Sequence, residues 1–183
     1  MFGEITNSEL LGGWTFKFEK ADKLPQNLAS AVSKLLTAKF GGSYVARFLV
    51  GTQTVNGINY KFIVERNMLV SGGKVKKSFA DLVINIPAGD ATGEKATIVS
   101  EKDANDFVLR DEIEAGVKKA ITEWTGCGIK LIVELGTGQL VKGMNYHFIA
   151  ECKAVYTDAE PYLARVVINN FQDNWVIDEI ERI

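Results

Sequence analysis

Residues 51–65 read GTQTVNGINYKFIVE, and residues 136–151 read GTGQLVKGMNYHFIAE. From Gln53 and Gln139 onward, the two stretches align without a gap. Eight residues are identical in the two copies. In the numbering of the first copy they are Gln53, Val55, Gly57, Asn59, Tyr60, Phe62, Ile63 and Glu65. The tripeptide VIN also recurs, at 83–85 and at 167–169. Repetition at a constant spacing indicates an internal duplication, so we expect two structurally similar halves.

The composition is that of a folded chain with no strong charge bias. The 183 residues are 46% hydrophobic and 24% charged, with a net charge of −2. A balance so close to neutral lacks the positive field that holds a phosphate backbone, so nucleic acid is not an expected partner. No stretch approaches the roughly 20 apolar residues of a membrane helix, so no membrane partner is expected either.

The N-terminal sequence and the two cysteines provide information on the cellular compartment in which the protein works. The start MFGEITNSELL has no positive region followed by an apolar run, so no signal peptide is expected. Localisation stays open: it leans cytoplasmic, and secretion is compatible if a leader has been removed. Cys127 and Cys152 lack the spacing of a zinc site, and we interpret them as free thiols, with a disulfide as the lesser alternative.

Hydrophobic periodicity predicts the order of elements. Trp14, Phe16 and Phe18 alternate with polar residues as in a half-buried strand, a helix follows Pro25 and ends before Gly41, and four hairpin-linked strands complete the copy. The second copy repeats this from a helix over 113–124, and its counterpart of the first strand is short or missing. A helix across one face of an antiparallel sheet explains both patterns, which predicts two α+β domains at 1–101 and 109–183, joined by a linker at 102–108.

The sequence offers little enzyme chemistry, and we expect no enzyme activity, metal or cofactor. His147 is the only histidine and lies in an alternating strand, where a structural role is the simpler interpretation. The stretch GTGQLVKG matches neither phosphate motif. A dinucleotide fingerprint needs glycine at Val141, a P-loop needs Lys-Ser or Lys-Thr after Gly143, and both motifs should open a helix rather than a strand.

The repeated tip resembles the Gln-x-Val-x-Gly signature of the cystatins, which inhibit papain-like cysteine proteases. QTVNG at 53–57 and QLVKG at 139–143 both fit, and each is followed by x-Asn-Tyr and a strand ending in Glu. The resemblance covers nearly the whole chain. It implies two tandem cystatin-like domains of the α+β class, each an antiparallel sheet wrapped on one helix.

The resemblance also implies a three-part contact with the protease. The parts are a glycine-containing N-terminal arm, the signature hairpin, and a second hairpin that often carries Trp. The arm is matched by LLGGW at 10–14, and the second hairpin by NFQDNW at 170–175. The implied protease-binding residues are Gly12, Gly13, Gln53, Thr54, Val55, Asn56, Gly57, Gln139, Leu140, Val141, Lys142, Gly143 and Trp175.

These parts are divided between the copies, since the first has the arm glycines and the second has the Trp. The first copy is therefore the better candidate. Trp14 and Trp175 have an alternative role as half-buried sheet aromatics, and Gly57 and Gly143 as residues needed for a positive backbone angle.

The leading hypothesis is a reversible competitive inhibitor of papain-like cysteine proteases, which blocks the active-site cleft with the arm and the hairpin loops. The alternative is a non-inhibitory interaction or scaffold protein built on the same duplicated fold, since fold does not imply function. A domain-swapped dimer, formed when chains exchange strands across an opened hairpin, is also compatible with such a fold.

Overall fold

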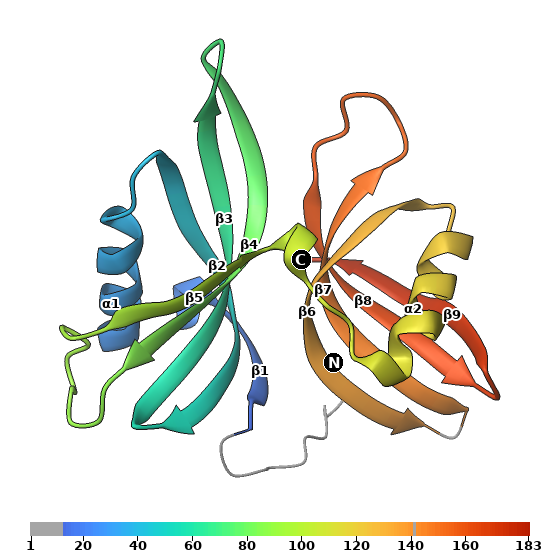
Figure 1. The fold of residues 1–183 in the computed structure, drawn as a ribbon, viewed down its shortest axis with the longest axis horizontal. Coiled ribbons are helices and arrows are strands. Elements are labelled where there is room, and N and C mark those ends of the chain that lie inside the picture. Colours follow the sequence, from blue (N-terminus) through green and yellow to red (C-terminus); the bar gives the residue numbers. More distant parts are fainter. Residues whose placement is uncertain (1–12, 141) are drawn as a thin grey trace. The chain divides into compact units, whose positions relative to one another are not determined.

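The computed structural model describes residues 13–140 and 142–183. The chain divides into two compact units, with the division between Asp103 and Ala104. Each unit contains one antiparallel sheet and one α-helix (Figure 1).

The first unit has a five-stranded sheet. Its strands follow the order of the chain, so that each pairs with the next through an antiparallel ladder. They are β1 (Thr15–Lys20), β2 (Gly42–Val55), β3 (Gly57–Val70), β4 (Lys74–Ile86) and β5 (Thr97–Asp103). A short 3-10 helix, η1 (Ala21–Lys23), leads from β1 toward the α-helix. Gly72 and Gly73, both with positive φ, make the turn between β3 and β4.

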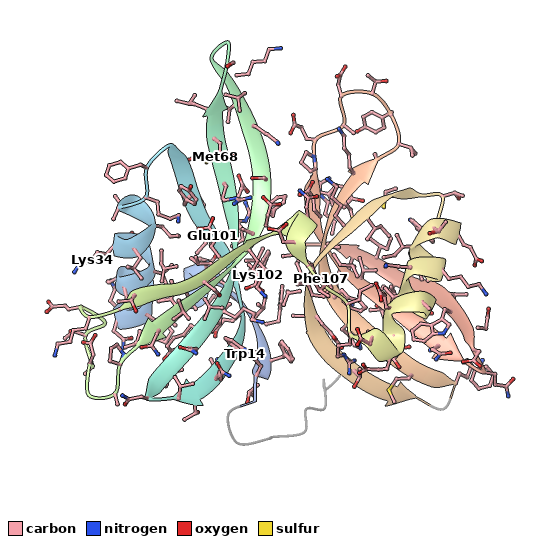
Figure 2. All side chains as sticks on the ribbon, viewed as in Figure 1. Trp14, Lys34, Met68, Glu101, Lys102 and Phe107 are labelled. Carbon is pink, nitrogen blue, oxygen red and sulfur yellow. The ribbon has the colours of Figure 1, made fainter. Side chains whose placement is uncertain are left out.

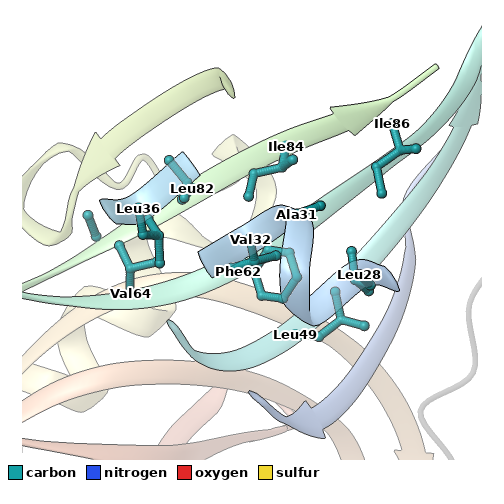
Figure 3. Close-up of a cluster of buried hydrophobic side chains, with 11 residues drawn as sticks. Leu28, Ala31, Val32, Leu36, Leu49, Phe62, Val64, Leu82, Ile84 and Ile86 are labelled. Atoms are coloured by element: carbon teal, nitrogen blue, oxygen red, sulfur yellow. The ribbon is translucent and has the colours of Figure 1, made fainter. Parts of the chain in front are cut away.

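Helix α1 (Gln26–Thr37) packs its apolar stripe on one face of this sheet. Pro25 stands at the N-cap, directly before the first helical residue, and its ring restricts φ, which is −54° here. Leu28, Val32 and Leu36 recur at helical spacing and are all buried. Figure 3 shows them facing the sheet. Their partners in the same cluster are Leu49, Phe62, Val64, Ala80, Leu82, Ile84 and Ile86.

The second unit has a four-stranded sheet in chain order. It starts with a 3-10 helix, η2, and an α-helix, and then four strands follow. The elements are η2 (Ala104–Asp106), α2 (Asp111–Glu123), β6 (Cys127–Leu140), β7 (Gly143–Ala154), β8 (Tyr162–Phe171) and β9 (Asn174–Arg182). Helix α2 buries Ile113, Val117 and Ala120 in a core cluster that also contains Phe148 and Val166.

The predicted fold class, α+β with each sheet wrapped on one helix, is wrong. The structure is mostly β, with 57% strand and 18% helix, and its layout is two antiparallel sheets with little helix. The reason lies in element lengths. A 12-residue helix such as α1 is only about 18 Å long. The strands β2, β3 and β4 have 13 or 14 residues and reach about 45 Å. The helix therefore covers a small part of a sheet that dominates the unit.

The segment predicted as a linker, 102–108, is structured for most of its length. Strand β5 continues through Asp103, which pairs with Ala80 of β4. Phe107 packs edge-on against Phe148 in the core of the second unit, with 6.5 Å between ring centroids. The polar sequence SEKDANDF gave no sign of either role, because a short strand end and a single half-buried aromatic residue are too short to show a periodic pattern.

Both cysteines are free thiols in the second unit. Cys152 is buried in the core cluster, whereas Cys127 is only half-buried. Burial, together with the neighbouring Cys127 thiol, raises the pKa of Cys152 to about 12. Since the thiolate is the reactive form of cysteine, Cys152 should be almost inert at neutral pH.

We expect an aromatic disulfide reagent at pH 8 to modify one thiol per native chain, at Cys127, and two thiols per chain in denaturant. The absorbance of the released thiolate gives both counts, and Cys127→Ser should abolish the fast reaction. Two equally fast thiols in the native chain would contradict the burial of Cys152. No reactive thiol until a reductant is added would indicate a disulfide instead.

Candidate functional site at one end of the first sheet

Three segments of the first unit lie at the same end of its sheet. Strand β1 runs antiparallel to β2 with Thr15 opposite Thr52, so Gly13 lies at the end of the sheet where β2 turns into β3. Strand β4 reaches that end at Ile86, which pairs with Ile58 just after the turn. We call these segments the contact end: Gly13, the tip at residues 54–57, and the loop at residues 87–91 (Figure 1).

The tip is a very tight hairpin that exposes small and apolar groups. Val55 and Gly57 are register partners, so Asn56 is the only residue between them. The side chain of Val55 is 44% exposed, and that of Ile58, the first residue after Gly57, is 40% exposed. Thr54 and Asn56 are exposed as well. Such a tip can enter a narrow cleft with little steric hindrance.

Gly57 fastens the tip to the loop of the contact end. Its φ is +108°, and a Cβ there would lie 2.2 Å from the carbonyl oxygen of Ile86 and 2.8 Å from the amide nitrogen of Ala88. Gly143 repeats this geometry in the second unit, with φ +108° and the carbonyl oxygen of Asn170 at 2.2 Å from such a Cβ. The repeated glycine therefore has a structural reason in both copies, since only glycine combines this φ with so close an approach.

A ladder of side-chain amides braces the strands behind each tip. In the first unit, Asn85 Nδ2 donates to Asn59 Oδ1 at 2.8 Å, and Asn59 Nδ2 donates to Gln53 Oε1 at 2.9 Å. In the second unit, Asn169 Nδ2 donates to Asn145 Oδ1 at 2.7 Å and to the backbone oxygen of Lys142 at 3.3 Å. The ladder thus explains why asparagine recurs both in the long repeat and in VIN.

The two tips nevertheless differ by one residue. The glycines that precede them, Gly51 and Gly136, hold equivalent places opposite Lys61 and His147. The second copy then has the additional residue Gly138. Consequently Gly138 lies opposite Asn145, where the first copy has Gln53 opposite Asn59.

The second hairpin therefore closes with a longer turn. Leu140 pairs with Gly143, so two residues lie between them instead of one. Lys142 is exposed, and Gln139 takes the register position opposite Met144. Val141 lies outside the described residues. Both copies have the same sequence motif, but the turn that carries it has one residue in the first copy and two in the second.

The loop of the contact end is ordered by Asp90. Its carboxylate accepts hydrogen bonds from the backbone amides of Lys95, at 2.8 Å, and Gly93, at 3.0 Å, and from Thr92 Oγ1 at 3.0 Å. These bonds, above all that from Lys95, lower the pKa of Asp90. Asn27 of α1 donates to the backbone oxygen of Ala91 at 3.2 Å. The loop is thereby attached to the helix.

A shallow groove of about 310 Å³ lies beside the tip. It is lined mainly by apolar groups and by the loop backbone: Asn27, Gly57, Ile58, Tyr60, Ile86, Pro87, Ala88, Gly89, Asp90 and Ala91. The contact end therefore combines a projecting hairpin with an apolar recess next to it.

Trp175 does not have the exposure that a contact residue requires. It follows the β8–β9 turn, where Gln172 and Asp173 have positive φ, but its side chain is only 9% exposed. The ring stacks on Tyr146, with 5.2 Å between centroids, and lies against Gly116 of α2. Its predicted role in protease contact is therefore not supported, and the alternative of a buried sheet aromatic fits better. Of the arm residues, Gly13 is exposed and Gly12 lies outside the described residues.

His147 is half-buried in β7 of the second unit. Burial is the main cause that lowers the pKa of His147, and the positive charge of Arg165 is the second. The Nδ1 atom of His147 is buried and has no hydrogen-bond partner among the described residues. Among all the described residues, no group of three or more His, Cys, Asp or Glu side chains could hold a metal ion. No helix in residues 13–140 and 142–183 is long and apolar enough to span a membrane.

Comparison with known proteins identifies no relative. No family model, curated protein or solved structure matches the chain.

Proposed function

We propose that the chain is a reversible competitive inhibitor of papain-like cysteine proteases, acting through the contact end of its first unit. The observation that carries the proposal is the convergence of three segments at that end. The N-terminal segment at Gly13, the exposed tip around Val55 and the loop after Ile86 lie together on one rigid sheet. Gly13 and the tip are two of the three parts that the resemblance to the cystatins implies, and the loop after Ile86 holds in the first unit the place that the hairpin at 170–175 holds in the second.

The physics of the tip suits occlusion of a cleft. The hairpin is held by the amide ladder and by Gly57, so it loses little conformational entropy on docking. Val55 supplies exposed apolar surface at the end of the tip. An inserted hairpin of this kind fills the substrate cleft without placing a scissile bond at the nucleophile, which gives reversible inhibition.

The first unit is the better inhibitor on three grounds. The turn at its tip is one residue shorter than that of the second unit, and Gly13 lies at the same end of the sheet. In the second unit, the aromatic residue of the β8–β9 hairpin is buried in the core.

Titration of the intact chain against papain, while hydrolysis of a peptide substrate is followed, tests the proposal. We expect competitive loss of rate, and Val55→Glu should weaken inhibition by about 100-fold, because a charge at the centre of an apolar contact is a hot-spot change. Val99→Glu is the matched control, since Val99 is 55% exposed and lies on β5, outside the contact end. Circular dichroism should show that both variants remain folded.

Absence of inhibition by the unmodified chain at micromolar concentration would contradict the proposal. That result would favour the alternative of a non-inhibitory scaffold protein, because Gly57 and the amide ladder also serve to make a stable hairpin. If Val55→Glu inhibited as strongly as the unmodified chain, inhibition would still be real, but the tip would not be part of the contact with the protease. Val141→Glu tests the second copy in the same assay.

A further inference from the structure

A row of side chains crosses the first sheet on the face away from α1. Lys61 of β3 lies at its centre, with Nζ 4.3 Å from the ring centroid of Trp14 and 5.9 Å from that of Phe16. On its other side, Lys61 Nζ is 3.8 Å from Asp81 Oδ2 of β4. Lys102 of β5 is the register partner of Asp81 and completes the row. Figure 2 labels its two ends, Trp14 before β1 and Lys102 on β5.

Gly51 makes room for the aromatic end of this row. It is the register partner of Lys61 on β2, between Lys61 and the first strand. A Cβ on Gly51 would lie 3.3 Å from Cε3 of Trp14 and 3.5 Å from Cδ1 of Phe16. Because glycine has no side chain, both rings can lie close over β2 and within reach of the ammonium group of Lys61.

Asp81 holds Lys61 in place. The side chains of Lys61 and Asp81 are 15% and 13% exposed, so the pair is largely desolvated. Burial lowers the pKa of Lys61, and the charge of Asp81 opposes that shift by favouring the ammonium form. An ammonium group removed from water binds an aromatic face more strongly than an exposed one.

The second copy provides an internal comparison. His147 occupies the place of Lys61, opposite Gly136, and Arg165 occupies the place of Asp81, opposite Ile149. The described residues of that copy contain no counterpart of β1 or of Trp14. The lysine and the aspartate are thus found in the copy whose sheet carries the N-terminal strand.

We propose that Lys61 is a positioning residue, which holds Trp14 on the sheet and so fixes the position of the adjoining Gly13 at the contact end. Trp14 directly follows Gly13, so a ring held on the sheet limits the movement of Gly13. The consequence for binding rests on the proposed inhibitory function, whereas the seating of Trp14 does not depend on it.

General packing of β1 does not explain the arrangement. Phe18 stacks on Phe48 with 4.9 Å between ring centroids, and this contact anchors the strand at its other end. Strand β1 also pairs with β2 through its backbone, so we expect this pairing to persist when residue 61 is replaced. Loss of Lys61 should therefore release Trp14 without unfolding the unit.

Fluorine NMR of the full chain labelled with 5-fluorotryptophan tests the seating directly. The chain has three tryptophans, and loss of one resonance in Trp14→Phe assigns that of Trp14. The test variant is Lys61→Met with Asp81→Asn, which removes both charges and leaves no charged group buried alone. We expect its Trp14 resonance to move toward the unfolded position while those of Trp124 and Trp175 stay in place. The single variant Lys61→Arg keeps both the cation and Asp81, so its Trp14 resonance should have the same chemical shift as in the original chain.

An unmoved Trp14 resonance in the double variant would overturn the proposal, and so would equal movement of all three resonances. In a papain titration, the double variant should inhibit about tenfold less well than the original chain, equivalent to about 1.4 kcal/mol. Unchanged inhibition with a displaced Trp14 would refute the role in binding. If the original chain does not inhibit at all, the proposed function fails, and the fluorine shift still decides the seating of Trp14.

Discussion

Replacement of Gly116 by alanine should destabilise the second unit by about 2–3 kcal/mol, although the same change inside an exposed helix normally stabilises by up to about 1 kcal/mol. Gly116 lies in α2 directly over Trp175. A Cβ there would lie 2.0 Å from Cε2 and 2.2 Å from Cδ2 of the indole. Trp175 is only 9% exposed and stacked on Tyr146, so the ring cannot move away without disturbing the core.

Hydrogen exchange of amides in α2 and β9 measures this loss in the second unit alone. A two-mutation cycle provides the control: Trp175→Leu removes the ring that the new methyl group meets, so Gly116→Ala should cost much less in that background. A gain of stability from Gly116→Ala in the original chain would contradict the close approach of α2 to Trp175.

Gly57→Ala should cost the first unit about 3–4 kcal/mol. Two effects add: a positive φ costs a residue with a Cβ about 1–2 kcal/mol, and the Cβ would overlap the carbonyl oxygen of Ile86, 2.2 Å away. The neighbouring strand end would have to shift, which separates the tip from the loop of the contact end. We therefore expect inhibition to fall together with stability.

Gly89→Ala separates the two effects. Gly89 also has a positive φ, of 81°, and lies in the contact-end loop, but a Cβ there would meet no atom within 4 Å. The change should cost only about 1 kcal/mol. Unfolding of the first unit, followed through the exchange of β3 amides, compares the two variants. Equal costs would mean that the backbone angle, and not the approach of Ile86, explains the repeated glycine.

The periodic parts of the fold could be predicted from the sequence. The helix after Pro25 and the helix over 113–124 both form near their predicted positions, because an apolar stripe at helical spacing needs a face to bury. The balance between helix and sheet could not be read in this way. A periodic pattern indicates that a strand exists, but β2 and β3 extend through polar residues such as Gln53 and Asn67, whose place in the ladder depends on their partners.

The candidate site was predictable in its residues and not in its geometry. The recurrence of the Gln-x-Val-x-Gly residues marked the tip, and that of asparagine marked the ladder behind it. The burial of Trp175 was not visible, because it depends on Gly116, 59 positions earlier in the chain. Nor could an ungapped match show that Gly138 changes the register of the second tip, since register is set by pairing across the sheet.

The four-stranded sheet of the second unit leaves a consequence for self-association. Strand β6 spans 14 residues, and among the described residues only β7 pairs with it. Within the described part of the chain it is thus an edge strand, whereas β1 pairs with the corresponding side of β2. The ladder of β6 is broken twice, between Leu131 and Val133 and between Glu134 and Gly136. Such irregularities twist an edge strand away from flat pairing, and they are a device by which natural sheets resist aggregation by strand addition.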